Sequence, residues 1–282
     1  MILFKLASQL HQYIQQQKAL GKTIGFVPTM GALHKGHISL IDKSKASCNI
    51  TVCSIFVNPT QFNDVKDFEK YPITIEQDIY MLEIAKCDVL FLPSVDEMYP
   101  KDFDKNKQYN LGFIETVFEG AYRPGHFNGV CMVVERLLNI VTPNKLFLGQ
   151  KDYQQCIVLK RLVEIMNANI KIEICPTSRE ENGLAMSSRN KRLSEEMKSK
   201  AKIIYESFVN IKKEINTSNS SKLIENTKSL LLQNGFDKID YLSLANAETL
   251  APIEQWDGSS KLVILVAAFT EGVRLIDNMI LN

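Results

Sequence analysis

The chain has 282 residues, of which 45% are hydrophobic, and its formal net charge is +1 at pH 7. A chain of this length can bury one large core or two moderate ones, and two domains are favoured. The near-neutral charge does not supply the basic surface that nucleic-acid binding normally requires, so nucleic acid is not an expected partner. No apolar stretch is long enough to span a membrane, so no membrane association is expected.

The cysteines do not occur in pairs or at metal-ligand spacings. They lie singly in apolar runs, at positions 48, 53, 87, 131, 156 and 175. We therefore expect reduced core cysteines and a cytoplasmic protein. The first 17 residues have the spacing of an amphipathic helix and are too short and polar for a signal peptide.

After this helix, short apolar runs that are typical of buried strands alternate with segments of helical periodicity. The expected strands cover residues 24–27, 50–57, 88–92, 145–148 and 170–175. The expected helices cover residues 37–46, 75–86, 127–141 and 152–167. Nearly continuous apolar strands are typical of a parallel sheet that is covered on both faces. We predict an α/β fold over residues 1–176, a Rossmann-like doubly wound parallel sheet domain that binds nucleotide and substrate.

The sequence changes character after Pro176. A polar loop and two charged helices are followed by residues 216–221, which look like a low-complexity connector. Strands are then expected over residues 239–244, 261–269 and 273–277, with a short hairpin between the last two. We predict a smaller α+β C-terminal lid domain over residues 177–282.

One segment, residues 26–37, joins a buried strand to a helix through a loop that carries two histidines. His34 and His37 lie where the helix is expected to begin, and Gly36 between them lets a ligand approach the backbone. A helix N-terminus presents backbone N–H groups and a partial positive charge, which favour phosphate. Such a histidine pair can donate hydrogen bonds to phosphate oxygens during a transfer reaction. The alternative is that the histidines only cap the helix or lie on the surface.

Polar residues follow two of the expected strands, at the edge where ligands bind in open α/β sheets. Gln61 can both donate and accept, which suits a small substrate with hydroxyl and carboxylate groups, while Asn58 beside it could simply begin a turn. After the strand at 145–148, Lys151 offers an ammonium for phosphate and Asp152 a carboxylate for ribose hydroxyls. Asp152 could equally be a helix N-cap.

Two other segments place an arginine before an expected helix. Arg123 and His126 precede the long apolar helix, which Asn128 is expected to cap. Arg189 follows two serines within residues 185–190, and its guanidinium can bind two phosphate oxygens at once. Each of these segments on its own is a weak signal, because serine-rich loops and capped helix starts are common.

The His34–His37 segment resembles the His-x-Gly-His signature of the nucleotidyltransferase superfamily. Together, the five segments resemble the pantothenate synthetase (pantoate–β-alanine ligase) family, from about Gly25 to the last strand. This resemblance implies catalytic roles for His34, His37, Lys151 and Arg189, with His37 as proton donor. It implies an ATP site made of Met30, Gly31, Ala32, Leu33, His34, Lys35, Gly36, His37, Gly149, Gln150, Lys151, Asp152, Ser178, Met186, Ser187, Ser188 and Arg189. The implied substrate-binding residues are Gln61 and Gln155, with Asn58, Arg123 and His126.

The resemblance also implies a reaction. ATP would convert pantoate to pantoyl adenylate with release of pyrophosphate, and β-alanine would then displace AMP to give pantothenate. Mg²⁺ would be the cofactor, with ligands that we do not assign, and the protein would be a homodimer. Three positions depart from the family's usual residues: Ile73 replaces an arginine, Gln150 a glutamate and Asn182 an aspartate.

Two other functions fit parts of the same pattern. A nucleotidyltransferase that stops after attaching the nucleotide, such as a cytidylyltransferase, would carry the same His-x-Gly-His signature. Gln61 and Gln155 favour the ligase over it, because they are neutral contacts suited to an unphosphorylated substrate. A non-catalytic nucleotide-binding module would not require both histidines, Lys151 and Arg189 together.

Overall fold

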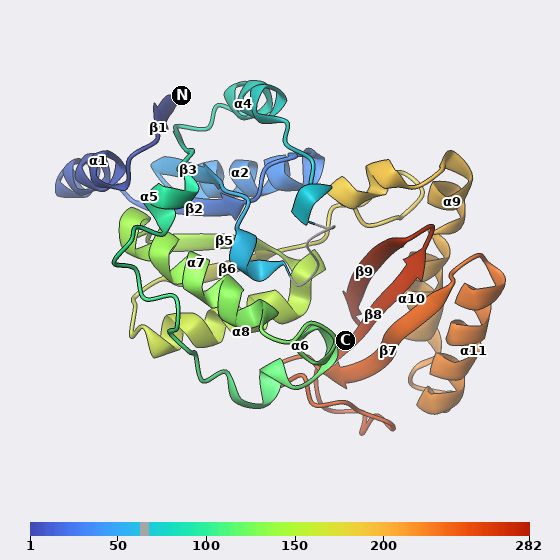
Figure 1. Ribbon diagram of the computed structural model, residues 1–282. Helices are drawn as coiled ribbons and strands as arrows, with labels where there is room; N and C mark the ends of the chain where they lie inside the picture. The colour runs from blue at the N-terminus through green and yellow to red at the C-terminus, as the bar shows by residue number, and fades with distance from the viewer. Residues whose placement is uncertain (63–67) are drawn as a thin grey trace. The chain divides into compact units, whose positions relative to one another are not determined.

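The computed structural model describes residues 1–62 and 68–282. The chain forms two compact units (Figure 1). The first consists of Met1–Gly149 and Gln155–Pro176, and the second of Gln150–Gln154 and Thr177–Asn282. The short segment Gln150–Gln154 therefore groups with the C-terminal part of the chain, although the sequence prediction placed it in the first domain.

The first unit contains a parallel six-stranded sheet with the order β1-β4-β3-β2-β5-β6. Its strands are β1 (Ile2–Phe4), β2 (Ile24–Thr29), β3 (Ile50–Ile55), β4 (Val89–Phe91), β5 (Lys145–Gly149) and β6 (Lys171–Cys175). The predicted Rossmann-like doubly wound sheet is confirmed. The edge strand β1 was not predicted, because three residues are too few to show an alternating pattern.

Helices cover both faces of this sheet (Figure 1). The helices of this unit are α1 (Ala7–Ala19), α2 (Lys35–Ser47), α4 (Ile75–Ile84), α5 (Val95–Met98), α6 (Phe118–Tyr122), α7 (His126–Val141) and α8 (Tyr153–Ile165), with 3₁₀ turns η1 (Pro59–Gln61) and η2 (Gly112–Glu115). The 3₁₀ turn η3 (Gln150–Asp152) and the first two residues of α8 belong to the second unit.

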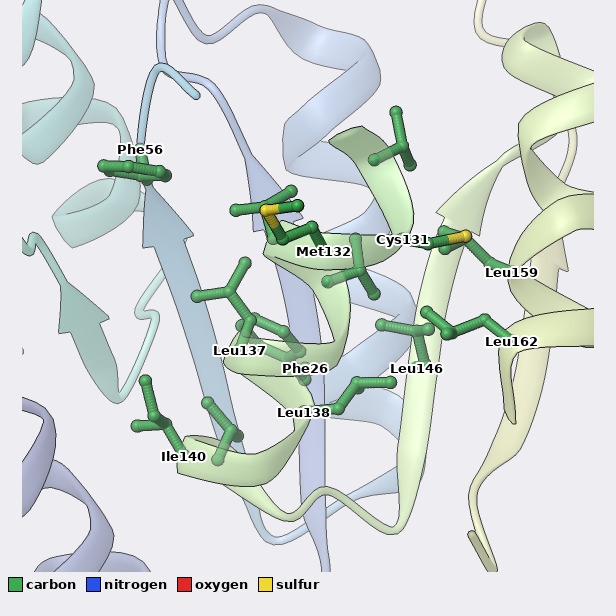
Figure 2. Close-up of a cluster of buried hydrophobic side chains, with 14 of the residues drawn as sticks. Phe26, Phe56, Cys131, Met132, Leu137, Leu138, Ile140, Leu146, Leu159 and Leu162 are labelled. Carbon is green, nitrogen blue, oxygen red and sulfur yellow. The ribbon is translucent and has the colours of Figure 1, made fainter. Parts of the chain in front are cut away.

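Successive strand residues point to opposite faces, so each strand contributes to two cores. Phe26 of β2 belongs to the core that α1, α7 and α8 cover, whereas Val27 belongs to the core under α2 and α4. Figure 2 shows the first of these cores, with Phe26 and Leu146 beside Leu138 of α7 and Leu162 of α8. The continuous apolar strands in the sequence reflect this burial on both faces.

Three local predictions were wrong. The second strand ends at Ile55 rather than at residue 57, and the chain then turns toward η1. Helix α2 begins at Lys35 rather than at His37, because His34 is its N-cap. Asn128 does not cap α7, whose N-cap is Gly125 with φ of 77°. The Asn128 side chain instead accepts from the Tyr109 N–H and donates to the Lys107 carbonyl.

The second unit is built on an antiparallel sheet of β7 (Lys238–Asn246), β8 (Leu262–Thr270) and β9 (Val273–Ile280). Its helices are α9 (Glu195–Lys200), α10 (Ile203–Glu214) and α11 (Ser220–Gln233), with the 3₁₀ turn η4 (Ser188–Arg192). The predicted hairpin is confirmed: Glu271 and Gly272 join β8 to β9, both with positive φ, as a tight hairpin turn requires. The expected connector is partly wrong, because Asn219 caps α11 and the helix begins at Ser220.

All six cysteines are free thiols, and only Cys48 is not buried. Burial raises the pKa of Cys87 to about 11 and that of Cys131 to about 12, so neither thiol is reactive at neutral pH. Within the described residues, no helix has both the length and the apolar character needed to cross a membrane.

Candidate active site

The order of the strands reverses between β2 and β5, which are paired at the centre of the sheet. In open α/β sheets, ligands bind outside the carboxyl ends of the strands at such a switch point. Strand β2 ends at Thr29, directly before the histidine loop, and β5 ends at Gly149, directly before η3. The topology therefore points to the two segments that the sequence analysis singled out.

His34 and His37 form a reciprocal capping box at the start of α2. Nδ1 of His34 accepts from the Gly36 N–H at 3.1 Å, and Nδ1 of His37 accepts from the His34 N–H at 3.3 Å. The two rings are adjacent, with centroids 4.1 Å apart. The cap that the sequence analysis set against a functional role is thus present, and it brings the rings together.

The capping box also shows which ring nitrogen can donate. A ring nitrogen that accepts a hydrogen bond carries no hydrogen, so in this arrangement the proton of each imidazole lies on Nε2. Two of the backbone N–H groups that were expected to meet a phosphate, those of His34 and Gly36, donate to the rings instead. The donor that remains on each ring is therefore its Nε2–H group.

Asp78 of α4 holds the loop that leads to these histidines. Its carboxylate is 1% exposed and accepts from the Ala32 N–H at 2.9 Å and the Leu33 N–H at 2.8 Å. Gly31 and Ala32 both have positive φ, 78° and 48°, so the loop makes a sharp turn against the carboxylate. Sequence reasoning gave Asp78 no role. Its only signal is a carboxylate on the otherwise apolar face of an expected helix.

Gln61, at the end of η1, lies beside Asn58 and Met30. Gln61 Nε2 donates to Met30 Sδ at 2.8 Å, and its Oε1 accepts from Asn58 Nδ2 at 3.3 Å. Asn58 is 1% exposed, and it also donates to the Gly129 carbonyl and accepts from the Tyr99 hydroxyl. The Asn58 amide is thus engaged within the protein and fixes the Gln61 side chain.

The segment that precedes α7 holds the Gln61 backbone. His126 Nδ1 is 2.8 Å from the Gln61 carbonyl oxygen, and a guanidinium nitrogen of Arg123 donates to the same oxygen at 3.5 Å. Gly129 lets α7 approach the turn, since a Cβ there would lie 2.4 Å from the Thr60 carbonyl oxygen. The structure therefore brings Arg123 and His126 to Gln61, as the sequence analysis grouped them.

The second unit holds the other predicted nucleotide contacts except Gly149, which ends β5 in the first unit. Lys151 and Asp152 lie in η3, with Lys151 Nζ 3.6 Å from Asp152 Oδ1. In the segment after Pro176, the Met186 N–H donates to the Ser178 carbonyl, and Ser187 caps η4 by accepting from the Arg189 N–H. Gln155 is half-buried in the part of α8 that belongs to the first unit.

The three departures from the family pattern have distinct environments. Ile73 is exposed. Gln150 Nε2 donates to Asn278 Oδ1 at 3.2 Å, a contact that a glutamate could not make as a donor. Asn182 Oδ1 accepts from the Leu184 N–H at 3.1 Å, so it keeps the acceptor that an aspartate would provide to this loop.

Among residues 1–62 and 68–282, no group of three or more His, Cys, Asp or Glu side chains could hold a metal ion as a cage of protein ligands. Asp78 lies in the first turn of α4, but both of its carboxylate oxygens accept from the backbone of the histidine loop. An ion that phosphate oxygens and water hold for the most part, as is common for Mg²⁺, does not need such a cage.

The family model for pantoate-beta-alanine ligase matches residues 2–280. The chain belongs to the pantoate–β-alanine ligase family. The pantothenate synthetase of Cytophaga hutchinsonii is 44% identical over 283 residues, which cover 100% of this chain and 99% of the relative.

Solved structures agree with this assignment. The pantothenate synthetase of Thermus thermophilus has a TM-score of 0.92 at 35% identity, covering 100% of this chain and 99% of that one. The pantoate–β-alanine ligase of Francisella tularensis, solved in complex with β-γ ATP and β-alanine, has a TM-score of 0.80 at 38% identity, covering 100% of this chain and 98% of that one. The resemblance found in the sequence is confirmed, and the chain is an enzyme that joins pantoate to β-alanine.

Proposed function

We propose that this ligase uses ATP to activate pantoate as an acyl adenylate. The pantoate carboxylate attacks the α-phosphorus of ATP and expels pyrophosphate. The β-alanine amine then attacks the acyl carbon, and AMP leaves with the carboxylate oxygen. Carboxylate and amine do not condense unaided, so the adenylate supplies the leaving group. The protein's contribution is positioning and charge stabilisation, without a covalent enzyme intermediate.

The observation that carries this proposal is the pair of adjacent histidine rings at the start of α2. Both rings keep their proton on Nε2, so His34 and His37 donate to phosphate oxygens while charge develops on them. His37 is the proton donor. The backbone from Met30 to Gly36 follows the ATP phosphates, and Asp78 sets its shape.

In the second unit, Lys151 and Arg189 offset the charge that builds on the departing pyrophosphate. The nucleotide is held, together with Lys151 and Arg189, by Gln150, Asp152, Ser178, Met186, Ser187 and Ser188. Gly149 permits the close approach of the nucleotide to the backbone. Asp152 is the candidate for the ribose hydroxyls, because its side chain is half-exposed and is a hydrogen-bond acceptor.

Gln61 contacts pantoate and β-alanine, and Gln155 contacts pantoate. Asn58, Arg123 and His126 act on the substrates through Gln61, since Asn58 holds its side chain and the other two hold its carbonyl. This refines the sequence prediction, which treated all five residues as direct contacts.

When bound with ATP, Mg²⁺ would lower the charge of the phosphates, and we assign it no protein ligand. We further propose a cytoplasmic homodimer, on the basis of the family resemblance. Light scattering of the purified protein tests the dimer, with a mass of twice 32.0 kDa expected and a mass of 32.0 kDa contradicting it.

Incubating the purified protein with Mg-ATP, pantoate and β-alanine tests the function. AMP, pyrophosphate and pantothenate in equal amounts are expected. A stable nucleotidyl product that β-alanine does not consume would instead indicate a nucleotidyltransferase. Binding of ATP without turnover would indicate a non-catalytic module.

A further inference from the structure

One buried side chain holds the turn that presents Lys151. Asn278 of β9 is 1% exposed, and its Nδ2 donates to the carbonyl oxygens of Gln150 and Lys151, both at 2.8 Å. Its Oδ1 accepts from Gln150 Nε2. Every hydrogen bond described for this side-chain amide therefore goes to the η3 turn, and all of these residues belong to the second unit.

The preceding residue of β9 holds a different segment. The Asp277 carboxylate accepts from both terminal nitrogens of Arg179, at 2.6 and 3.0 Å. The guanidinium also donates to the Gly183 carbonyl and lies 4.2 Å from the centroid of the Tyr205 ring. Consecutive strand residues point to opposite faces, so the end of β9 holds one segment on each side.

The segment held by Asp277 leads to the predicted nucleotide contacts. Arg179 pairs with Ala185 in an antiparallel bridge, and the Met186 N–H donates to the Ser178 carbonyl. Fixing Arg179 therefore fixes the backbone that continues into Ser187 and Arg189. The end of β9 thus connects two segments of the nucleotide site that lie about thirty residues apart in the sequence.

We propose that Asn278 and Asp277 are positioning residues of the ligase reaction, which hold the Lys151 turn and the Ser178–Arg189 segment at a fixed spacing for the ATP phosphates. The inference rests on the proposed roles of Lys151 and Arg189. Asparagine is suited to position 278 because only a side chain that donates hydrogen bonds can bind two carbonyl oxygens. Aspartate would place a carboxylate against those oxygens, although its shape is nearly the same.

Asn278→Ala tests this proposal, with Asn282→Ala as the matched control. Asn282 also bonds to the backbone of the same unit, at Leu262 and Ser260, but is not bonded to η3. We expect Asn278→Ala to raise the KM for ATP about tenfold, the effect of losing one or two buried hydrogen bonds. The KM for β-alanine should change less than about twofold. Asn278→Asp should raise the KM for ATP at least as much, and Asn282→Ala should leave the KM values for ATP and β-alanine unchanged.

A double-mutant cycle separates positioning from general stability. ATP affinity is measured by calorimetry for Asn278→Ala, Lys151→Ala and the double variant, so that inactive proteins can be compared. We expect Asn278→Ala to weaken ATP affinity less than about twofold when Lys151 is already replaced by alanine. A full tenfold effect in the Lys151→Ala background, or equal changes in all constants with a lowered Tm, would overturn the proposal. Failure of the wild-type protein to make AMP and pantothenate would instead refute the proposed function.

Discussion

Two turns of this ligase are shaped by buried side chains of opposite hydrogen-bonding character. In the first unit, the Asp78 carboxylate accepts from the N–H groups of Ala32 and Leu33. In the second unit, the Asn278 amide donates to the carbonyl groups of Gln150 and Lys151. Both side chains are 1% exposed.

The difference shows that each side chain is matched to the backbone groups that its turn presents. Aspartate and asparagine have almost the same shape, but an ionised carboxylate only accepts hydrogen bonds, whereas an amide also donates two. Exchanging aspartate for asparagine, or asparagine for aspartate, keeps the side-chain volume but no longer matches the hydrogen-bonding groups of the backbone. The comparison therefore predicts damage from Asp78→Asn as well as from Asn278→Asp, although neither residue is assigned a contact with substrate.

The first turn matters because it leads to His34 and His37, and removing these rings should have the largest effect. We expect His37→Ala and His34→Ala to slow pyrophosphate release about 10²–10⁴-fold, the usual contribution of a positioned proton donor. His11→Ala is the control, since that ring contacts only the Ile140 carbonyl among the described interactions of α1. Near-normal pyrophosphate release by both variants would refute the assigned roles.

Asp78→Asn should have the next largest effect. The variant replaces one of two charge-assisted acceptors with a donor that faces an N–H group, so we expect a loss of about 1.5–3 kcal/mol, or about 10–100-fold in ATP affinity. Asp42→Asn, at an exposed position of α2, is the control. If Asp78→Asn bound ATP normally, the carboxylate would not be needed to shape the loop.

Gly129→Ala tests whether packing, rather than a polar contact, also positions the site. A methyl group 2.4 Å from the Thr60 carbonyl oxygen must displace either α7 or the turn that carries Gln61. We expect an overpacking cost of about 1–3 kcal/mol in unfolding free energy and a rise in the KM for pantoate. Asn139→Ala, at an exposed position of the same helix, should change neither quantity. An unchanged KM would show that the turn tolerates the displacement.

Gln61→Ala should have the smallest and most selective effect. Loss of a hydrogen bond to a buried polar ligand costs about 1–3 kcal/mol, so the apparent affinity for pantoate should weaken at least about fivefold. Affinity for ATP should stay the same, as should both affinities in Gln77→Ala, which alters an exposed glutamine of α4. The reverse pattern, with a weaker affinity for ATP and an unchanged affinity for pantoate, would mean that Gln61 faces the nucleotide.

The sequence was sufficient to predict the doubly wound sheet, because strands buried on both faces leave continuous apolar runs such as residues 51–57. It was also sufficient to locate the histidine segment, since the spacing of His34, Gly36 and His37 is local. Element ends were less accurate: the prediction began α2 at His37, because a histidine N-cap is unusual compared with Ser, Thr, Asp or Asn.

Asp78 and Asn278 could not be identified in this way. Each holds backbone groups that lie far away in the sequence, 45 and 46 residues for Asp78 and 127 and 128 residues for Asn278. A backbone partner leaves no residue type to recognise, and single Asp or Asn residues in helices and strands are common. Only the tertiary structure shows that these two side chains face the turns next to the predicted nucleotide contacts.

The central claim is that the enzyme activates the pantoate carboxylate on the α-phosphorus of ATP. Pantoate labelled with ¹⁸O in its carboxylate tests this directly, since the attacking oxygen stays on phosphorus when the amine displaces AMP. Mass spectrometry of the products should find one ¹⁸O atom in each AMP, unlabelled pyrophosphate, and one ¹⁸O fewer in pantothenate than in pantoate. Unlabelled AMP, with the ¹⁸O atom lost from pantoate found in pyrophosphate instead, would contradict an adenylate intermediate, because it would place the attack on the β-phosphorus.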